Sequence, residues 1–255
     1  MELKIQDLSV SVANKEIIKH FNLDIKPGEI HVLMGPNGVG KSTICKALMK
    51  SPGYDITNGK IFFDRTDMTH LDTSEISKLG LYYISQNPPA IEGVTNAEML
   101  RLALSNKTGE KINIFAFNKK CNEICAKIDL PKSFLHRAIN DGMSGGERKK
   151  NELLHLWVLE PKVILLDEID SGLDVDALKT VAQSIMEYYE EKKPSILLIT
   201  HHTKLLNIIH PHQVHIMKEG CIIKSGDESL AQSIEKNGFQ NQFVTKELGE
   251  NKDEE

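Results

Sequence analysis

The stretch from Gly35 to Thr43 has the residue types and the spacing of a phosphate-binding loop. It reads GPNGVGKST, which satisfies the pattern G-x-x-x-x-G-K-[ST], and it lies between an apolar run and a helical pattern. Glycines allow backbone N–H groups to close around phosphate oxygens, and the start of the helix adds a partial positive charge. Lys41 would reach the β and γ phosphates, and the Ser42 hydroxyl would ligate Mg²⁺. The predicted nucleotide-binding residues are Gly35, Pro36, Asn37, Gly38, Val39, Gly40, Lys41, Ser42 and Thr43.

Two adjacent carboxylates follow a second apolar run, VILLDE at residues 163–168. The run indicates a buried strand that ends at Asp167, and ligands of α/β proteins bind at the carboxyl ends of such strands. Asp167 could hold Mg²⁺ there through water, and Glu168 is placed to polarise the water that attacks the γ-phosphate. Adjacent carboxylates after a strand are common, so the prediction depends on their combination with the phosphate-binding loop.

Two further polar residues come directly after short apolar runs. Gln86 follows LYYIS, where its amide can join Mg²⁺ or the attacking water. His201 follows ILLIT, where an imidazole can bind the γ-phosphate or steady Glu168. A single glutamine or histidine is usually just solvated. Their place in the order of motifs favours a catalytic role for Glu168, His201 and Gln86, and a Mg²⁺ site made by Ser42, Gln86 and Asp167.

The segment MSGGERKKNE, residues 143–152, predicts the start of a helix. Ser144-Gly145-Gly146-Glu147 fits S-x-x-E, a capping box in which the serine and the glutamate satisfy each other's backbone N–H groups. An ordinary capped helix is the simplest interpretation. The run Arg148-Lys149-Lys150 is not explained by it; Lys149 or Lys150 could pair with Glu168 in a resting monomer, although two solvated lysines are the simpler alternative.

The remaining pattern indicates an α/β fold in one domain. The first 30 residues alternate as antiparallel strands with a turn at Pro27-Gly28, and the short apolar runs within PKVILLDEID and KPSILLITHH suit buried strands of a parallel sheet. From Asn87 to Pro161 the pattern is helical, with no strong strand. We therefore predict an ATP-binding α/β core at 1–87 and 161–240, an inserted α-helical subdomain at 88–160 and a polar tail at 241–255.

Composition limits the class of protein. The chain has 255 residues, 40% of them hydrophobic, and a net charge of −5, so it can bury a sizeable core and shows no basic excess for binding nucleic acid. No apolar run is long enough to insert into a membrane, and residues 1–10 do not read as a secretory signal, so a cytoplasmic location is expected. Cys121 and Cys125 are interpreted as small apolar residues, and His210, His212 and His215 as surface and edge residues.

These motifs, taken in order, resemble those of the ATP-binding-cassette (ABC) ATPases over nearly the whole chain. GPNGVGKST is similar to the Walker A motif, Gln86 to the Q-loop, MSGGE to the signature motif, VILLDE to Walker B, SGLD to the D-loop and His201 to the switch histidine. The resemblance implies the ABC ATPase fold, with a P-loop core, an N-terminal antiparallel β subdomain and a helical insert. It also implies Mg²⁺-dependent ATP hydrolysis and head-to-tail pairing with a second copy. In such a pair Ser144, Gly145, Gly146 and Glu147 would meet ATP held by the other chain, next to a D-loop that ends at Asp174.

Within that family, several stretches are similar to the SufC ATPases of the Suf iron–sulfur cluster assembly system. They include MSGGERKKNELLHLWVLEP and LLDEIDSGLDVDALKTVA; most transporter ATPases have Gln where this chain has Glu147. The resemblance implies SufB and SufD scaffold proteins as partners, which ATP-driven pairing would remodel. Two alternatives remain: the nucleotide-binding subunit of an ABC transporter, and an ATP-gated clamp that barely hydrolyses, against which Glu168 argues.

Two expectations concern binding surfaces. ABC ATPases usually stack an aromatic side chain on adenine, and Val12 occupies that position here, so another residue must supply the packing or the packing is weaker. Neither Tyr54 nor Phe21 is assigned to this role. The segment NPPAIEGVTNAEML, residues 87–100, is the predicted docking surface for a partner, and a plain connector is the alternative.

Overall fold

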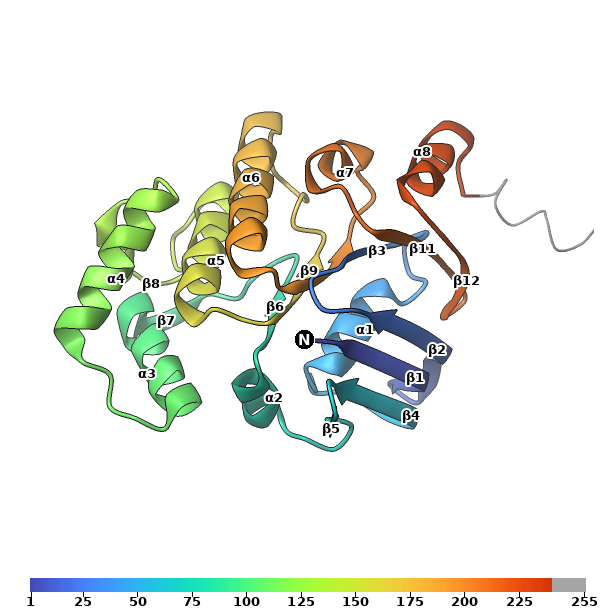
Figure 1. The fold of residues 1–255 in the computed structure, drawn as a ribbon, viewed down its shortest axis with the longest axis horizontal. Helices are drawn as coiled ribbons and strands as arrows, with labels where there is room; N and C mark the ends of the chain where they lie inside the picture. The colour runs from blue at the N-terminus through green and yellow to red at the C-terminus, as the bar shows by residue number, and fades with distance from the viewer. Residues whose placement is uncertain (240–255) are drawn as a thin grey trace, which may run out of the picture.

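The computed structural model describes residues 1–239, so the predicted tail at 241–255 lies outside the described residues. Its centre is a mostly parallel sheet in the order β12-β11-β3-β10-β9-β6, with β12 antiparallel to β11 (Figure 1). The strands are β3 (Ile30–Met34), β6 (Leu81–Ile84), β9 (Val163–Asp167), β10 (Ser195–Ile199), β11 (Gln213–Lys218) and β12 (Cys221–Gly226). The carboxyl ends of β3, β6, β9 and β10 meet at one edge, because all four run parallel.

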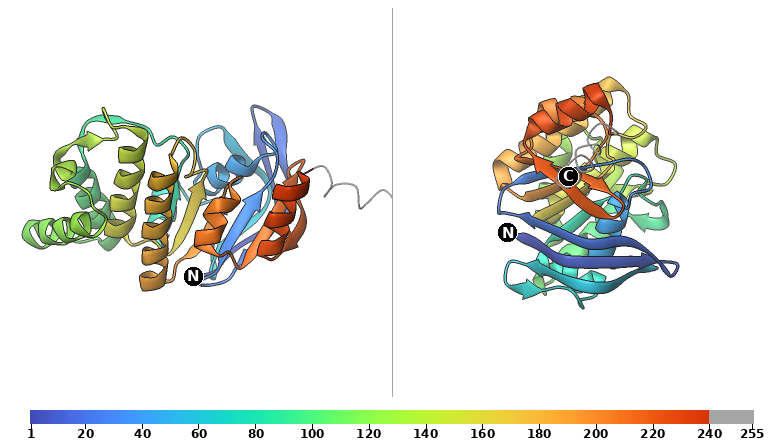
Figure 2. Two further views of the ribbon diagram at one scale, coloured as in Figure 1. Left: turned by 90° about the horizontal axis from the view of Figure 1, so that it is seen from above. Right: turned by 90° about the vertical axis from the view of Figure 1, so that its right-hand side faces the viewer.

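A second sheet, antiparallel and in the order β2-β1-β4-β5, is formed by the N-terminal part of the chain. Its strands are β1 (Leu3–Val12), β2 (Lys15–Ile25), β4 (Tyr54–Phe63) and β5 (Thr66–Asp67). Helix α1 (Lys41–Leu48) lies between the two sheets (Figures 1 and 2). Its buried Ile44, Cys45, Ala47 and Leu48 belong to one core with residues of both sheets. The start of α1 is therefore held rigidly by packing on two sides.

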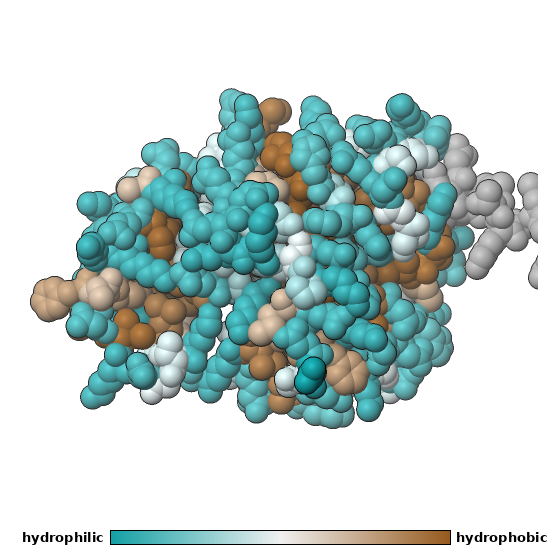
Figure 3. Space-filling model, in the orientation of Figure 1, coloured by the Kyte–Doolittle hydropathy of each residue, from teal (hydrophilic) through white to brown (hydrophobic). Residues whose placement is uncertain are grey.

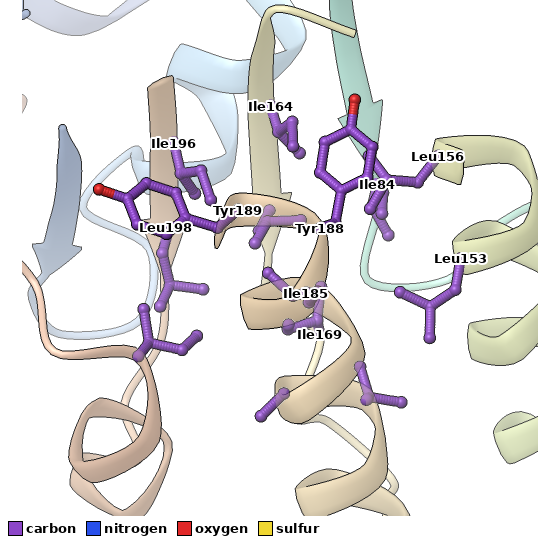
Figure 4. Packing of buried hydrophobic residues seen from close by; sticks show 14 of the residues in the cluster. Ile84, Leu153, Leu156, Ile164, Ile169, Ile185, Tyr188, Tyr189, Ile196 and Leu198 are labelled. Carbon is purple, nitrogen blue, oxygen red and sulfur yellow. The ribbon is translucent and has the colours of Figure 1, made fainter. Parts of the chain in front are cut away.

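The central sheet separates two cores, because successive side chains of a strand point to opposite faces. In β9, Val163 and Leu165 join the core around α1, whereas Ile164 and Leu166 join the core under the other helices. Figure 4 shows Tyr188 and Tyr189 of α6 packed among residues of β9, β10 and α5 in this second core. The helices on this side are α5 (Gly145–Leu159), α6 (Val175–Lys192), α7 (Thr203–Ile209) and α8 (Glu228–Asn237).

The predicted helical segment projects from the core at the left of Figure 1. It contains α3 (Asn96–Thr108), α4 (Ile114–Lys127) and the short helix η1 (Lys132–His136), while α2 (Thr73–Leu79) precedes β6. The segment also contains a short pair of strands that was not predicted, since β7 (Ile91–Thr95) pairs with β8 (Ala138–Ile139). That sheet is short because only two pairs of residues meet in it, so a pattern of alternation could not reveal it. Cys121 and Cys125 are buried and free of disulfides, as predicted.

Most of the surface in Figure 3 is hydrophilic, and hydrophobic residues show at several places, one of them the left end over α3 and α4. Exposed apolar side chains there include Leu102 and Phe115, the latter 88% exposed. Within residues 1–239, no helix combines the length and the apolar composition that crossing a membrane requires.

A chain of hydrogen bonds, buried at its centre, ties β3, β11 and β12 together, and it corrects the expectation that His215 lies at the surface. The Nδ1 atom of His215 lies 2.7 Å from the Ser225 hydroxyl, and its Nε2 atom lies 3.0 Å from Nδ1 of His31. His31 Nε2 in turn lies 2.9 Å from a carboxylate oxygen of Glu29. Burial lowers the pKa of His31, and burial together with His31 lowers the pKa of His215 to about 4. Both rings are therefore neutral at pH 7.

We predict that this network makes the protein less stable as the pH falls below about 6.5, the ordinary pKa of histidine. Between that value and the pKa of His215 at about 4, the unfolded chain binds a proton that the folded chain does not. The free energy of unfolding then falls by about 1.4 kcal/mol per pH unit, or roughly 3 kcal/mol in total. Urea unfolding curves collected between about pH 7 and pH 5 measure this slope.

His215→Gln should make the slope smaller, because it removes the group that titrates. The matched control is His210→Gln, since that side chain is 69% exposed and lies outside the network. Equal slopes in the unchanged protein and in both variants would contradict the prediction.

Candidate active site

The phosphate-binding loop connects β3 to α1, as predicted from the sequence. At two of its glycines, Gly35 and Gly40, a side chain would not fit. Gly40 has φ 106°, and a Cβ added to it would lie 2.6 Å from Ile18 Cδ1. A Cβ on Gly35 would lie 2.5 Å from the carbonyl oxygen of Met217. The loop is thus held close to β2 and β11, and its backbone stays open to an anion at the helix N-terminus.

Lys41 is the first residue of α1, and its buried side chain turns back over the loop. Its Nζ atom donates to the carbonyl oxygens of Gly35 at 2.8 Å and Pro36 at 3.0 Å. Burial lowers the pKa of this ammonium, while the carboxylates of Glu168 and Asp167 raise it. The charge therefore lies among the loop carbonyls and beside two acids, within the space where the loop would hold phosphate.

Asp167 ends β9 beside this loop and is held by two hydroxyl groups. Its Oδ1 accepts a hydrogen bond from Ser42 Oγ at 2.9 Å, and its Oδ2 accepts one from Tyr83 at 2.8 Å. Burial raises the pKa of Asp167, and both hydrogen bonds oppose that rise. Tyr83 was not predicted; it follows from strand order, since β6 lies next to β9 and pairs Tyr83 with Leu165.

The oxygens of Ser42 and Asp167 fit a Mg²⁺ site, since this ion takes hard oxygen ligands. Among residues 1–239, no cluster of three or more His, Cys, Asp or Glu side chains could hold a metal ion by itself. Mg²⁺ does not require one when phosphate oxygens and water complete its coordination. The side chain of the third predicted ligand, Gln86, is hydrogen-bonded to Glu168 and not to Ser42 or Asp167.

Glu168 is held from two sides by the other predicted catalytic residues. Its Oε1 lies 3.0 Å from Nε2 of His201, and its Oε2 accepts a hydrogen bond from Gln86 Nε2 at 2.8 Å. Glu168 also has φ 45°, a left-handed conformation that is uncommon for a residue with a side chain and is often found at functional sites. Burial and the Lys41 charge lower the pKa of His201, although Glu168 opposes them, so a neutral ring donates from Nε2 to the carboxylate.

A cavity of about 510 Å³ lies between the phosphate-binding loop and Glu168. Its lining includes Lys41 and Ser42 of the loop together with Gln86 and Glu168. Val12, Ile17 and Tyr54 of the antiparallel sheet line it as well. The cavity therefore has a charged and polar part suited to phosphate and a part with apolar and aromatic side chains.

The signature segment begins α5, as predicted, and its capping box is present. Ser144 accepts from the Glu147 N–H at 3.3 Å, and Glu147 accepts from the Ser144 N–H at 2.8 Å. Arg137 also binds Glu147, at 3.0 Å. Ser144 and Gly145 are exposed, and neither lines the cavity at the phosphate-binding loop of the same chain. Asp174 caps α6 by accepting from the N–H of Ala177 at 2.8 Å.

The basic run after the signature has local partners, and the suggested pairing of a lysine with Glu168 is wrong. Lys149 is 5% exposed and donates to the carbonyl oxygens of Ser85 at 3.1 Å and Gln86 at 2.9 Å. Lys150 binds the carbonyl oxygen of Asp129 at 3.1 Å. The signature helix is thus attached through Lys149 to the backbone of the residue that binds Glu168.

Comparison with known proteins agrees with this geometry. The family model described as "ABC transporter" matches residues 18–171. Vegetative protein 296 of Bacillus subtilis (strain 168) is 43% identical over 97% of this chain and 94% of its own length. A probable ABC transporter ATP-binding protein of Streptococcus pyogenes serotype M18 is 45% identical over 93% of both chains. The probable ATP-dependent transporter ycf16 of Antithamnion sp. is 43% identical over 93% of this chain and 96% of its own.

Solved structures show the same fold at lower identity. The dimeric structure of a bacterial ABC transporter cassette matches with a TM-score of 0.76 at 22% identity, covering 89% of this chain and 98% of the cassette. A dimeric post-hydrolysis state of such a cassette, bound to ADP and Pi, matches with a TM-score of 0.75 over the same fractions.

Proposed function

We propose that this chain, which belongs to the ABC transporter ATPase family, is the ATP-hydrolysing subunit of the Suf iron–sulfur cluster assembly machinery. It is an ATPase that uses ATP and Mg²⁺. The observation that carries the proposal of hydrolysis at this site is the Glu168 carboxylate, held by His201 and Gln86 next to the phosphate-binding loop.

The proposed division of roles follows from the positions of the side chains. Lys41 and the N–H groups of the loop bind the phosphates, and Ser42 and Asp167 hold Mg²⁺ with Gln86 nearby. Mg²⁺ supplies charge neutralisation at the phosphate oxygens. Glu168 accepts a proton from the attacking water, while His201 and Gln86 keep its two oxygens in place.

We also propose that two copies pair head to tail when ATP is bound. Within one chain the signature residues do not line the cavity that contains Lys41. The exposed Ser144 and the N–H groups of Gly145 and Gly146 form a capped helix N-terminus, which attracts phosphate. In a pair, this N-terminus would meet the γ-phosphate held by the other chain, beside the D-loop that ends at Asp174.

The Suf role rests on the sequence around the signature and the D-loop, and SufB and SufD are the partners proposed from it. The proposed docking surface is the segment 87–100. There Ile91 and Val94 are exposed apolar residues, 43% and 36% exposed, on a strand that pairs at only two positions. An edge strand with exposed apolar side chains is suited to binding another chain.

We expect that Glu92→Lys and Gly93→Asn will each weaken copurification with coexpressed SufB and SufD. The first reverses a charge on the exposed strand. The second adds a side chain where nothing lies within 4 Å, and asparagine tolerates the φ of +75° found there. Glu219→Lys, at an exposed position on the β11–β12 turn, is the matched control. Undiminished copurification with both variants would exclude this docking surface.

The second candidate is the nucleotide-binding subunit of an ABC transporter, which the printed names of several relatives favour. The fold and the hydrolytic site would be the same, and only the driven partner would differ. Copurification of the tagged chain with a membrane permease, and with no β-rich scaffold protein, would select the transporter and overturn the Suf role.

A further inference from the structure

The nucleotide cavity has a wall that the hydrolytic residues do not use. Val12, Ile17 and Tyr54 line the same cavity as Lys41 of the phosphate-binding loop. All three come from the antiparallel sheet: Val12 ends β1, Tyr54 begins β4, and Ile17 lies near the start of β2. A nucleotide with its phosphates at Lys41 must place its base elsewhere in the cavity, and this wall offers apolar contact.

Strand register places Val12 and Tyr54 side by side. The two residues are directly paired in the antiparallel ladder between β1 and β4. Directly opposite residues of such a ladder point to the same face, with Cβ atoms about 5 Å apart. Tyr54 therefore lies next to Val12, the position where the sequence lacks the expected aromatic side chain.

Tyr54 is the aromatic residue among those that line the cavity, and its side chain is hydrogen-bonded to α1. Its hydroxyl accepts a hydrogen bond from Lys46 Nζ at 3.0 Å. Lys46 belongs to α1, the same helix that begins with Lys41, so the ring is tied to the element that carries the phosphate site. Phe21, the other aromatic residue considered from the sequence, is completely buried in the core and cannot meet a ligand.

We infer that Tyr54 provides the aromatic face on which the base of the bound nucleotide stacks, replacing the aromatic residue that Val12 displaces. This inference rests on the proposed nucleotide site. Stacking of a base on an aromatic side chain is worth about tenfold or more in affinity. It reads the face of the base and not its edge, so ATP and GTP should depend on Tyr54 to the same extent.

Calorimetric titration with Mg²⁺ present tests this assignment, using ATP, GTP and inorganic tripolyphosphate as ligands. Tyr54→Ala should weaken ATP and GTP by about tenfold and leave tripolyphosphate unchanged, because tripolyphosphate has no base. Tyr54→Phe keeps the ring and should bind ATP about as the unchanged protein does. In the Tyr54→Ala background, Val12→Tyr should restore part of the lost affinity, because the two positions are paired on one face. Phe115→Ala, at an exposed site on α4, is the control for a lost aromatic side chain.

Two results would overturn the assignment of Tyr54. One is unchanged ATP affinity in Tyr54→Ala; the other is an equal loss for ATP and tripolyphosphate, which would make Tyr54 a structural support of the loop. Failure of the unchanged protein to bind any of the three ligands would instead overturn the nucleotide site itself, and the stacking role with it.

Discussion

Replacing Glu168 with glutamine is expected to lower the rate of ATP hydrolysis roughly 10²–10⁴-fold, because a glutamine cannot accept the proton of the attacking water. The substitution keeps the size and shape of the side chain, and an amide can still meet His201 or Gln86. ATP binding should therefore persist, since the phosphate-binding loop is unchanged. The measurements are steady-state phosphate release and the elution volume of the protein with ATP and Mg²⁺.

The same variant distinguishes a hydrolytic enzyme from a clamp. If Glu168 is the general base, Glu168→Gln should accumulate as an ATP-bound dimer that elutes earlier than the monomer. The matched control is Glu219→Gln, an exposed glutamate that does not line the cavity, which should behave as the unchanged protein. Turnover in Glu168→Gln close to that of the control would contradict the assigned role and favour an ATP-gated clamp.

Ser144→Asp is expected to lower turnover roughly 10²–10³-fold, about the effect of losing one donor to a developing negative charge. Aspartate is as good an N-cap as serine, so α5 keeps its start. The added carboxylate would instead repel the γ-phosphate that the signature is proposed to bind. Thr95→Asp is the matched control, because Thr95 also begins a capping box, at the start of α3.

Mixing Ser144→Asp with Lys41→Met shows whether the signature acts on its own chain or on a second one. In a dimer of either variant alone, both of the sites formed between the two chains contain the substitution. A mixed pair joins the intact loop of one variant to the intact signature of the other, so phosphate release should rise clearly above that of either variant. Mixtures that stay as inactive as the separate variants would contradict head-to-tail pairing.

Lys149 connects the signature helix to the residues around Glu168 within one chain. It belongs to the signature helix and holds the backbone of Ser85 and Gln86, while the Gln86 side chain holds Glu168. A movement of α5 on pairing would therefore shift the backbone at Gln86, and with it the hydrogen bond that Gln86 donates to Glu168. The burial of Lys149 is offset by its two carbonyl acceptors and by nearby carboxylates, which oppose the lowering of its pKa.

Much of the fold follows from patterns that lie within short windows of the sequence. The strands β9 and β10 are found where apolar runs predict them. The capping box at Ser144 is also present, because it depends only on residues three apart. The helices α2, α7 and α8 and the β7–β8 pair were not predicted, since they are short and carry few repeats of any period.

The sequence by itself determined the phosphate-binding loop, the acidic pair that follows β9 and the family to which they belong. These features depend on residue types at fixed spacing along the chain. Only the tertiary structure decided which side chains meet: Tyr83 with Asp167, His201 and Gln86 with Glu168, and Tyr54 with the nucleotide cavity. The physical reason is strand order, since the arrangement β10-β9-β6 and the pairing of β1 with β4 bring together residues far apart in sequence, and no local pattern specifies that arrangement.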